Sequence, residues 1–363
     1  MANKNYISIN TIDYDKLFNR TSIEIDSKDC IDYLEHKKIL ITGGGGSIGS
    51  EIVKQLLYLD INQLYIIDIS EYGLHSLKYE IDFLFPNNNV KYLLHNITDK
   101  NKMKQIFKEI KPEIVFHAAA YKHVSFMEDN IYEATRINIL GTKIIADLSF
   151  DYDIKKFLFV STDKAVNPTS VMGASKRISE LYLHYLNDKM KTEYVITRFG
   201  NVFGSSGSVI PTFIDRLNKN RNLCVTHKKV IRYFMSIPES AKLVIKAVTI
   251  GVGGEILLFD MGKPVKIIDL AQNLLKMFPR KNVSIEIIGL QPGEKLYEEL
   301  LCNTEEVLPT KEKKIMKLRN KKKNNKMKDF IDKYTYLVNN YGIISNDDLK
   351  NIYKEIVPEY NNN

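Results

Sequence analysis

Short apolar runs alternate with longer amphipathic stretches through the first 200 residues of the chain. Almost wholly apolar runs of this length are typical of strands buried on both faces of a sheet, and apolar residues three and four positions apart indicate helices. We predict strands at residues 38–42, 63–68, 90–94, 114–118, 157–161 and 194–198, and helices at 50–59, 102–110, 133–150 and 173–189. This alternation predicts an α/β fold with a Rossmann-type, doubly wound parallel sheet.

The pattern changes after residue 198, where a loop-rich segment is followed by irregular alternation. We therefore expect a smaller, mixed C-terminal region, with terminal helices at 329–341 and 346–356. The predicted divisions are an N-terminal arm at 1–36, the α/β domain at 37–200, the mixed region at 201–310, a basic segment at 311–328 and the C-terminal helices within 329–363.

Charge is concentrated in one place. The chain has 363 residues, 44% hydrophobic and 26% charged, with a formal charge of +8. Residues 311–328 contain nine lysines, one arginine and one glutamate, a net +9, so the remainder is close to neutral. A near-neutral body argues against nucleic acid as a partner. We expect the basic segment to be solvated or next to an oligomer contact, with attraction to a membrane surface a weaker alternative.

Several other classes of protein are disfavoured. Cys30, Cys224 and Cys302 lie far apart, which supports neither a disulfide framework nor a metal site and fits a reducing, cytoplasmic setting. The N-terminus has no apolar core typical of a signal peptide. No apolar run is long enough for a transmembrane helix, so we expect no integral membrane segment.

A glycine-rich turn follows the first predicted strand. Gly43, Gly46 and Gly49, with Ser47 and Ile48 between the last two, come directly before a predicted helix. Glycines at this spacing permit a tight turn, close approach to a pyrophosphate and close packing of the helix on the strand. The alternative is a merely tight turn between strand and helix.

The residues at the end of the next predicted strand indicate which dinucleotide the chain binds. Asp68 stands there and suits the ribose hydroxyls of a dinucleotide. No arginine or lysine follows within residues 69–73 that would accept a 2′-phosphate, which favours NAD over NADP.

Six further segments, taken together with the glycine turn, resemble the extended short-chain dehydrogenase/reductase superfamily. Within it they look like the UDP-N-acetylglucosamine 4,6-dehydratases of bacterial polysaccharide biosynthesis. The segments are residues 116–124, 138–142, 161–177, 200–211, 232–235 and 289–296. The resemblance covers about residues 9–315. Members of this group often carry a membrane anchor, and this chain is expected to be a soluble form.

The resemblance implies further cofactor contacts in the predicted NAD-binding domain. Asn96 stands where the superfamily usually has an aspartate beside the adenine, and its amide oxygen can accept a hydrogen bond from the adenine amine. Lys176 would hold the nicotinamide ribose, and Asn138 would orient the site. The remaining implied contacts are Ile97, Ala118, Ala119 and Ala120.

One departure from the superfamily concerns its catalytic Tyr-x-x-x-Lys pair. Met172 stands at the tyrosine position, four residues before Lys176, and a thioether has no proton to exchange. The dehydratase group has a similar methionine, so the resemblance moves the proton transfers to Thr162, Asp163 and Lys164. We expect Met172 itself only to pack.

The reaction that the resemblance implies begins with NAD taking the C4 hydride of the sugar while the C4 hydroxyl loses its proton. The C4 ketone then acidifies C5, a base removes the C5 proton, an acid protonates the leaving C6 hydroxyl, and the hydride returns to C6. Asp163 is our expected acid and Lys164 our expected base, with the reverse assignment open. As a base Lys164 needs a lowered pKa, from burial or from the charge of Lys176. Thr162 would contact or orient the C4 oxygen.

The substrate-binding residues are expected in the mixed C-terminal region and one loop. Arg232 suits a phosphate, and Glu294 suits the nucleoside ribose. Gln291 replaces an arginine usual in the family, which removes a charge next to this site. The other expected substrate contacts are Lys122, Asn201, Ser208 and Val209.

The expected function is NAD-dependent dehydration of a UDP-N-acetylhexosamine, with UDP-N-acetylglucosamine as the first choice, for surface polysaccharide or glycan biosynthesis. A dehydratase that inverts C5, a 4-epimerase and an inactive NAD-binding scaffold are the alternatives. Met172 disfavours the ordinary epimerase, which relies on tyrosine. We expect a homo-oligomer that binds a UDP-sugar and no metal.

Overall fold

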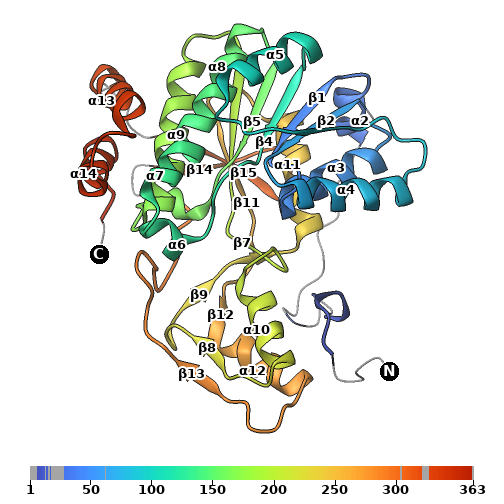
Figure 1. Cartoon of the computed structure of the whole chain (residues 1–363), viewed down its shortest axis with the longest axis vertical. Helices are drawn as coiled ribbons and strands as arrows, with labels where there is room; N and C mark the ends of the chain where they lie inside the picture. The colour runs from blue at the N-terminus through green and yellow to red at the C-terminus, as the bar shows by residue number, and fades with distance from the viewer. Residues whose placement is uncertain are drawn as a thin grey trace.

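A nine-stranded sheet forms the centre of the protein (Figure 1). The computed structural model describes residues 6–12, 14, 17, 28–61, 63–302, 305–320 and 327–361. The strand order is β14-β15-β11-β6-β5-β4-β1-β2-β3, and the strands from β11 to β3 run parallel. Their bounds are β1 Ile39–Thr42, β2 Leu64–Asp68, β3 Lys91–Leu94, β4 Ile114–His117, β5 Lys156–Val160, β6 Glu193–Arg198 and β11 Ile256–Phe259. The six predicted strands and the doubly wound fold are confirmed.

Two hydrophobic cores cover the two faces of this sheet. Leu40 packs into one core while its neighbours Ile39 and Ile41 pack into the other, because successive strand residues point to opposite faces. One face is covered by α5 (Lys100–Ile110), α7 (Ile131–Ala134), α8 (Thr142–Asp151) and α9 (Val171–Asn187). The other is covered by α2 (Lys28–Leu34), α3 (Ser47–Tyr58), α4 (Glu71–Leu84) and α11 (Ile237–Ile250).

The single helix predicted at 133–150 is divided in the structure. A π-helical segment, Thr135–Gly141, lies between α7 and α8 and contains Asn138. π-Helical turns inside α-helices are frequent at functional sites. The helix predicted to begin at residue 50 begins at Ser47, within the glycine turn.

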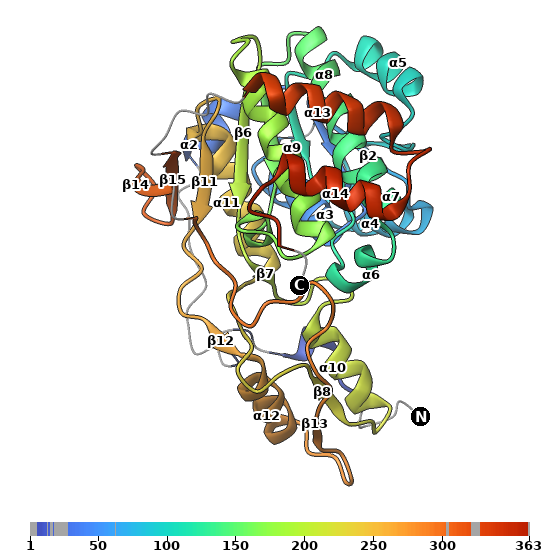
Figure 2. The same ribbon diagram turned by 90° about the vertical axis from the view of Figure 1, so that its left-hand side faces the viewer.

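The two C-terminal helices lie against the face that carries α7 and α9 (Figures 1 and 2). They are α13 (Met327–Asn340) and α14 (Asn346–Ile356). Tyr334 of α13 stacks on Tyr182 of α9 with ring centroids 4.4 Å apart, and Tyr353 of α14 hydrogen-bonds Thr135 at 2.9 Å. None of the helices within the described ranges has both the length and the apolar character to cross a bilayer.

A smaller lobe lies below the sheet in Figure 1. Its core also takes Ile7, Ile12 and Leu17 from the N-terminal arm. Its elements are α10 (Val209–Asn218), β8 (Leu223–Val225), β9 (Ile231–Arg232), β12 (Val265–Lys266), α12 (Ile267–Met277) and β13 (Ile285–Ile287). The paired strands β7 (Asn201–Val202) and β10 (Phe234–Met235) lie where the lobe joins the sheet.

The large sheet takes more of the chain than residues 37–200, because α11, β11, β14 (Glu305–Pro309) and β15 (Ile315–Asn320) return to it. β15 lies inside the predicted basic segment. Its apolar residues Ile315 and Leu318 are buried, while Lys317 lies 3.1 Å from Glu255 in an ion pair. This part of the segment is therefore a strand of the sheet, since its apolar positions have a core to enter. Residues 321–326 lie outside the described ranges.

A buried ion cluster joins β6, α9 and β14. The guanidinium of Arg198, 1% exposed, lies 2.6 Å from Glu180 and 2.9 Å from Glu305. Burial raises the pKa of Glu180, but Arg198 and Arg177 outweigh it and lower the pKa to about 2. Because the folded pKa is depressed, this contribution to stability is present above the unfolded pKa of 4.5 and is lost as the pH falls from there towards 2.

Glu180→Gln should lower the free energy of unfolding by about 3–5 kcal/mol at neutral pH, because Arg198 loses a buried counter-charge. Denaturant titration measures this. The matched control is Glu306→Gln, whose carboxylate pairs with the exposed Arg319 and should change stability by less than about 1 kcal/mol. Equal losses in both variants would contradict the importance of the buried cluster.

Candidate active site

The glycine turn after β1 leaves no room for a side chain at Gly43, Gly44 or Gly49. A Cβ added at Gly49 would lie 2.2 Å from the carbonyl oxygen of Gly43, and one at Gly43 would lie 2.5 Å from the backbone nitrogen of Ala119. Gly43 also has a φ of 73°, which other residues rarely adopt. Sequence reasoning missed Gly44, where a Cβ would lie 2.1 Å from Ile66. The turn therefore packs β1, α3 and the end of β4 against one another.

The turn and its surroundings fit a dinucleotide. Gly46 is the N-cap residue of α3. Because glycine has no side chain, Gly46 cannot cap the first backbone N–H groups of the helix. Such N–H groups suit a pyrophosphate. Asp68, at the end of β2, accepts hydrogen bonds from the N–H of Gly45 at 2.9 Å and of Ser70 at 2.8 Å. The expected carboxylate thus lies directly beside the glycine turn.

Two predicted cofactor contacts are occupied by the protein itself. The amide oxygen of Asn96 accepts from both the N–H and the hydroxyl of Thr98, at 2.9 Å each, so contact with an adenine amine would require one bond to break. Asn138 is buried and hydrogen-bonds the backbone of Tyr121 through both ends of its amide, and it also donates to Ser175. Asn138 therefore holds the loop after β4 in place.

The other predicted contacts surround this turn and loop. Ala118, Ala119 and Ala120 follow β4, and Gly43 approaches the first two closely. Ile97 is buried against Gly141 of the π-helical segment. Ser47 and Ile48 begin α3, and the hydroxyl of Ser47 accepts a hydrogen bond at 3.1 Å from the N–H of Ser206. The loop after β7 thereby reaches the glycine turn.

Lys176 lies buried in α9, with its Nζ 3.8 Å from the centroid of the Phe159 ring. Burial lowers the pKa of Lys176 to about 7. Met172, one helical turn earlier, is 3% exposed and packs in the hydrophobic core, as expected. His117 is fully buried between the hydroxyls of Thr42 and Thr142, so it is a structural residue.

Asp163 and Lys164 form a close pair directly after β5. The Nζ of Lys164 lies 2.9 Å from Oδ1 of Asp163 and 3.0 Å from the amide oxygen of Asn201. The hydroxyl of Thr162 also donates to Oδ1 of Asp163, at 2.9 Å, and so helps to fix the carboxylate. The second oxygen, Oδ2, is buried and has no hydrogen-bond partner among the described residues. It is free to accept or share a proton.

The protonation state of Lys164 differs from our expectation. Burial lowers its pKa, but the carboxylates of Asp163 and Glu298 outweigh burial, and the pKa is raised above its usual value. The lysine is therefore an ammonium in the free protein. We expected the charge of Lys176 to help lower the pKa of Lys164, but the two carboxylates have the stronger effect and raise it.

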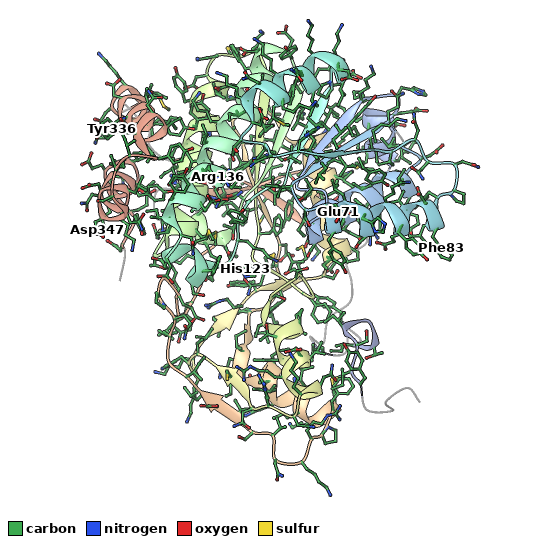
Figure 3. The ribbon with its side chains drawn as sticks, viewed as in Figure 1. Glu71, Phe83, His123, Arg136, Tyr336 and Asp347 are labelled. Atoms are coloured by element: carbon green, nitrogen blue, oxygen red, sulfur yellow. The ribbon has the colours of Figure 1, made fainter. Side chains whose placement is uncertain are left out.

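A cavity of about 310 Å³ lies between the two lobes next to this pair. His123, which Figure 3 shows at the junction of the lobes, lines it together with Lys164 and Val209. The predicted substrate residues Arg232 and Glu294 line the cavity as well.

The donors of Arg232 are already bound by the protein. Its terminal nitrogens donate to the carbonyl oxygens of Ile231 and Lys295, at 2.7 and 2.8 Å, and lie 3.2 Å from Glu294. Glu294 in turn accepts from the hydroxyl of Thr226. Arg232 therefore braces the segment around residue 295, and to bind a phosphate it would have to exchange some of these bonds.

Three of the predicted substrate contacts do not line the described cavity. Ser208 is the N-cap of α10, and its buried hydroxyl has no partner in the described part of the chain. Asn201 contacts Lys164 rather than the cavity wall. Lys122 precedes the cavity residue His123 but does not itself line the described cavity. Sequence reasoning missed Glu298, a buried residue that lines the cavity. Its position four residues after Glu294 is the one local signal for it in the sequence.

Comparison with known proteins places these features in a family. Residues 39–320 match the polysaccharide biosynthesis protein family. The chain is 43% identical to the capsular polysaccharide biosynthesis protein CapD of Staphylococcus aureus over 83% of this chain and 51% of that protein. The chain therefore spans about half the length of CapD.

Two shorter relatives match over most of their length. The UDP-N-acetylglucosamine 4,6-dehydratase (inverting) of Campylobacter jejuni is 34% identical over 74% of this chain and 78% of that protein. The UDP-glucose 4-epimerase of Rickettsia bellii is 36% identical over 74% of this chain and 79% of that protein.

The fold is also found among solved structures. The dTDP-glucose 4,6-dehydratase DesIV of Streptomyces venezuelae, which has NAD bound, superposes with a TM-score of 0.65 at 22% identity. The match covers 72% of this chain and 87% of that one. This likeness supports the Rossmann-type fold in which the neighbour holds its NAD.

Gly49→Ala should lower the free energy of unfolding by at least about 1–3 kcal/mol, because the new Cβ would meet the backbone of Gly43. Thermal and denaturant unfolding measure the effect. Gly342→Ala is the control, since a Cβ there has nothing within 4 Å. An unchanged stability of Gly49→Ala would show that the turn can open without cost.

Proposed function

The chain belongs to the polysaccharide biosynthesis protein family, and on that basis we propose that it is an NAD-dependent 4,6-dehydratase of UDP-N-acetylhexosamines. UDP-N-acetylglucosamine is the proposed substrate, and the 4-keto-6-deoxy sugar nucleotide is the product. The observation that carries the proposal is the Asp163–Lys164 pair, with a buried carboxylate oxygen that lacks a partner among the described residues. The dehydratase relative from Campylobacter jejuni supports the same reaction class.

The fit of NAD rests on the turn after β1. Gly43 and Gly49 leave no room for a Cβ, Asp68 lies beside the turn, and the N-cap residue of α3 makes no side-chain hydrogen bond to the helix N-terminus, which suits a pyrophosphate. NAD, when bound, would take up the hydride from C4 of the sugar as the C4 hydroxyl gives up its proton, and would return the hydride to C6 while C5 regains a proton. Lys176, buried in α9, would hold the nicotinamide ribose.

The elimination itself needs a base for the C5 proton and an acid for the C6 hydroxyl, which leaves as water. Asp163 and Lys164 are the proposed proton carriers, and Thr162 holds Asp163 through a hydrogen bond. Because Lys164 is an ammonium in the free protein, the resting charges favour Lys164 as the donor and Asp163 as the acceptor. This is the reverse of the assignment that we expected from the sequence.

A 4-epimerase is the second candidate, and the relative from Rickettsia bellii favours it. Both reactions begin with loss of the C4 hydroxyl proton, but the ordinary epimerase relies on the superfamily tyrosine for it, and the buried Met172 stands at that position here. The two reactions have different products: the epimerase keeps the C6 hydroxyl and inverts C4, whereas the dehydratase loses one water.

Incubation of the purified chain with NAD and UDP-N-acetylglucosamine should yield a sugar nucleotide lighter by the mass of one water. Mass spectrometry detects the loss, and NMR of the product assigns C4, C5 and C6 and so distinguishes retention from inversion at C5. A panel with other UDP-hexoses serves as the comparison. Unchanged substrate at high enzyme concentration, or an isomer of equal mass, would refute dehydration.

Asp163→Asn and Lys164→Met should each lower turnover by about 10²–10⁴-fold, since each removes one of the two proton carriers. Initial rates of product formation measure the effect, and circular dichroism checks the fold. Asp188→Asn and Lys189→Met form a matched control, because this exposed Asp-Lys pair ends α9 far from the cavity residues. Near-native turnover in either active-site variant would exclude that residue as a proton carrier.

A further inference from the structure

Glu298 is a buried acid without an assigned role. Its side chain is 4% exposed and lines the cavity between the lobes. Oε1 lies 3.9 Å from Nζ of Lys164 and 3.6 Å from Nε of Arg232. Oε2 is buried and has no hydrogen-bond partner among the described residues. A carboxylate in such a place is costly unless cations compensate for its lost hydration, and the two cations do so here.

Glu298 stands between two parts of the protein. Lys164 follows β5 of the large sheet, whereas Arg232 belongs to β9 of the smaller lobe. Both cations approach the same oxygen of Glu298. A shift of the carboxylate towards either cation therefore changes the electrostatic environment of the other.

The charges around Lys164 are nearly balanced. Asp163 and Glu298 attract its ammonium from 2.9 and 3.9 Å, and the positive charge of Arg232 opposes them. His123, Glu294 and Lys295 line the same cavity, with Glu294 bound to Arg232 and Lys295 bound to the carbonyl oxygen of Val166. Of these groups, only Asp163 and Glu298 are acids that pair with Lys164.

We propose that Glu298 is a positioning residue that holds Lys164 against Asp163 and connects it to Arg232 of the smaller lobe. The proposal deepens the proposed function, on which it rests for the role of Lys164 in proton transfer. If a ligand bound Arg232 and moved it away from Glu298, the carboxylate of Glu298 would then interact with Lys164 only. Lys164 would then be most firmly protonated when the cavity is filled.

The direct test measures the protonation of Lys164 without any substrate. Trace acetylation with acetic anhydride over a pH series, followed by mass spectrometry of the Lys164 peptide, gives the fraction of neutral amine. In Glu298→Gln the titration midpoint should fall by about one pH unit, so labelling below the midpoint should rise about tenfold. The exposed Lys219 in the same samples provides the internal reference.

Glu299→Gln is the matched control, because its exposed carboxylate binds Asn167 and Lys295 instead of Lys164. Its Lys164 midpoint should equal that of the unmodified protein. Glu298→Asp keeps the negative charge but moves it further from Lys164, because the side chain is one methylene shorter. Its Lys164 titration midpoint should therefore fall by less than in Glu298→Gln. This variant also serves as the test should Glu298→Gln not fold. An unchanged midpoint in a folded Glu298 variant, or an equal shift in Glu299→Gln, overturns the proposal.

Failure of this inference is distinguishable from failure of the proposed function. If the chain dehydrates UDP-N-acetylglucosamine but the titration midpoint of Lys164 is the same in the Glu298 variants, the positioning role is wrong and the function stands. If no sugar nucleotide turns over but the midpoint shifts, the contact is established and the reaction is wrong. In an active protein, Glu298→Gln should also shift the pH profile of turnover, which a residue needed only for folding would not do.

Discussion

The parallel direction of the strands is the constraint on which the site depends. Because β1, β2, β5 and β6 run the same way, their carboxyl ends meet at one edge of the sheet. The glycine turn beginning at Gly43 follows β1, Asp68 ends β2, and Asp163 and Lys164 follow β5. Asn201 comes directly after the loop that ends β6. Groups far apart in the sequence therefore reach one another at this edge, and the smaller lobe lines the other side of the cavity.

Much of this arrangement could be predicted because its signals are local. β1 and β4 are buried at every residue, and the turn that follows β1 has residues that limit its conformation. Gly43 and Gly49 are such residues, since both lie too close to neighbouring backbone for any side chain. The Asp163–Lys164 pair is also local, as the two residues are adjacent and follow a buried strand.

The features that were missed depend on contacts between distant segments. β15 was predicted as part of a basic segment because the lysines on either side of it dominate the composition of residues 311–328, yet Ile315 and Leu318 enter the two cores. Glu298 could not be told from Glu299 by sequence, although one is buried beside Lys164 and the other is exposed. Arg232 has the right chemistry for a phosphate, but only the structure reveals how many protein acceptors already hold it.

Two lysines of this site, the buried Lys176 and the partly buried Lys164, have pKa values shifted in opposite directions. Burial dominates at Lys176, which faces the ring of Phe159, and brings its pKa to about 7. At Lys164 the same cost is exceeded by the attraction of Asp163 and Glu298, and the pKa rises. The carboxylates, rather than depth of burial, therefore decide which amine is charged. At neutral pH the site holds one lysine that keeps its proton and one close to its midpoint.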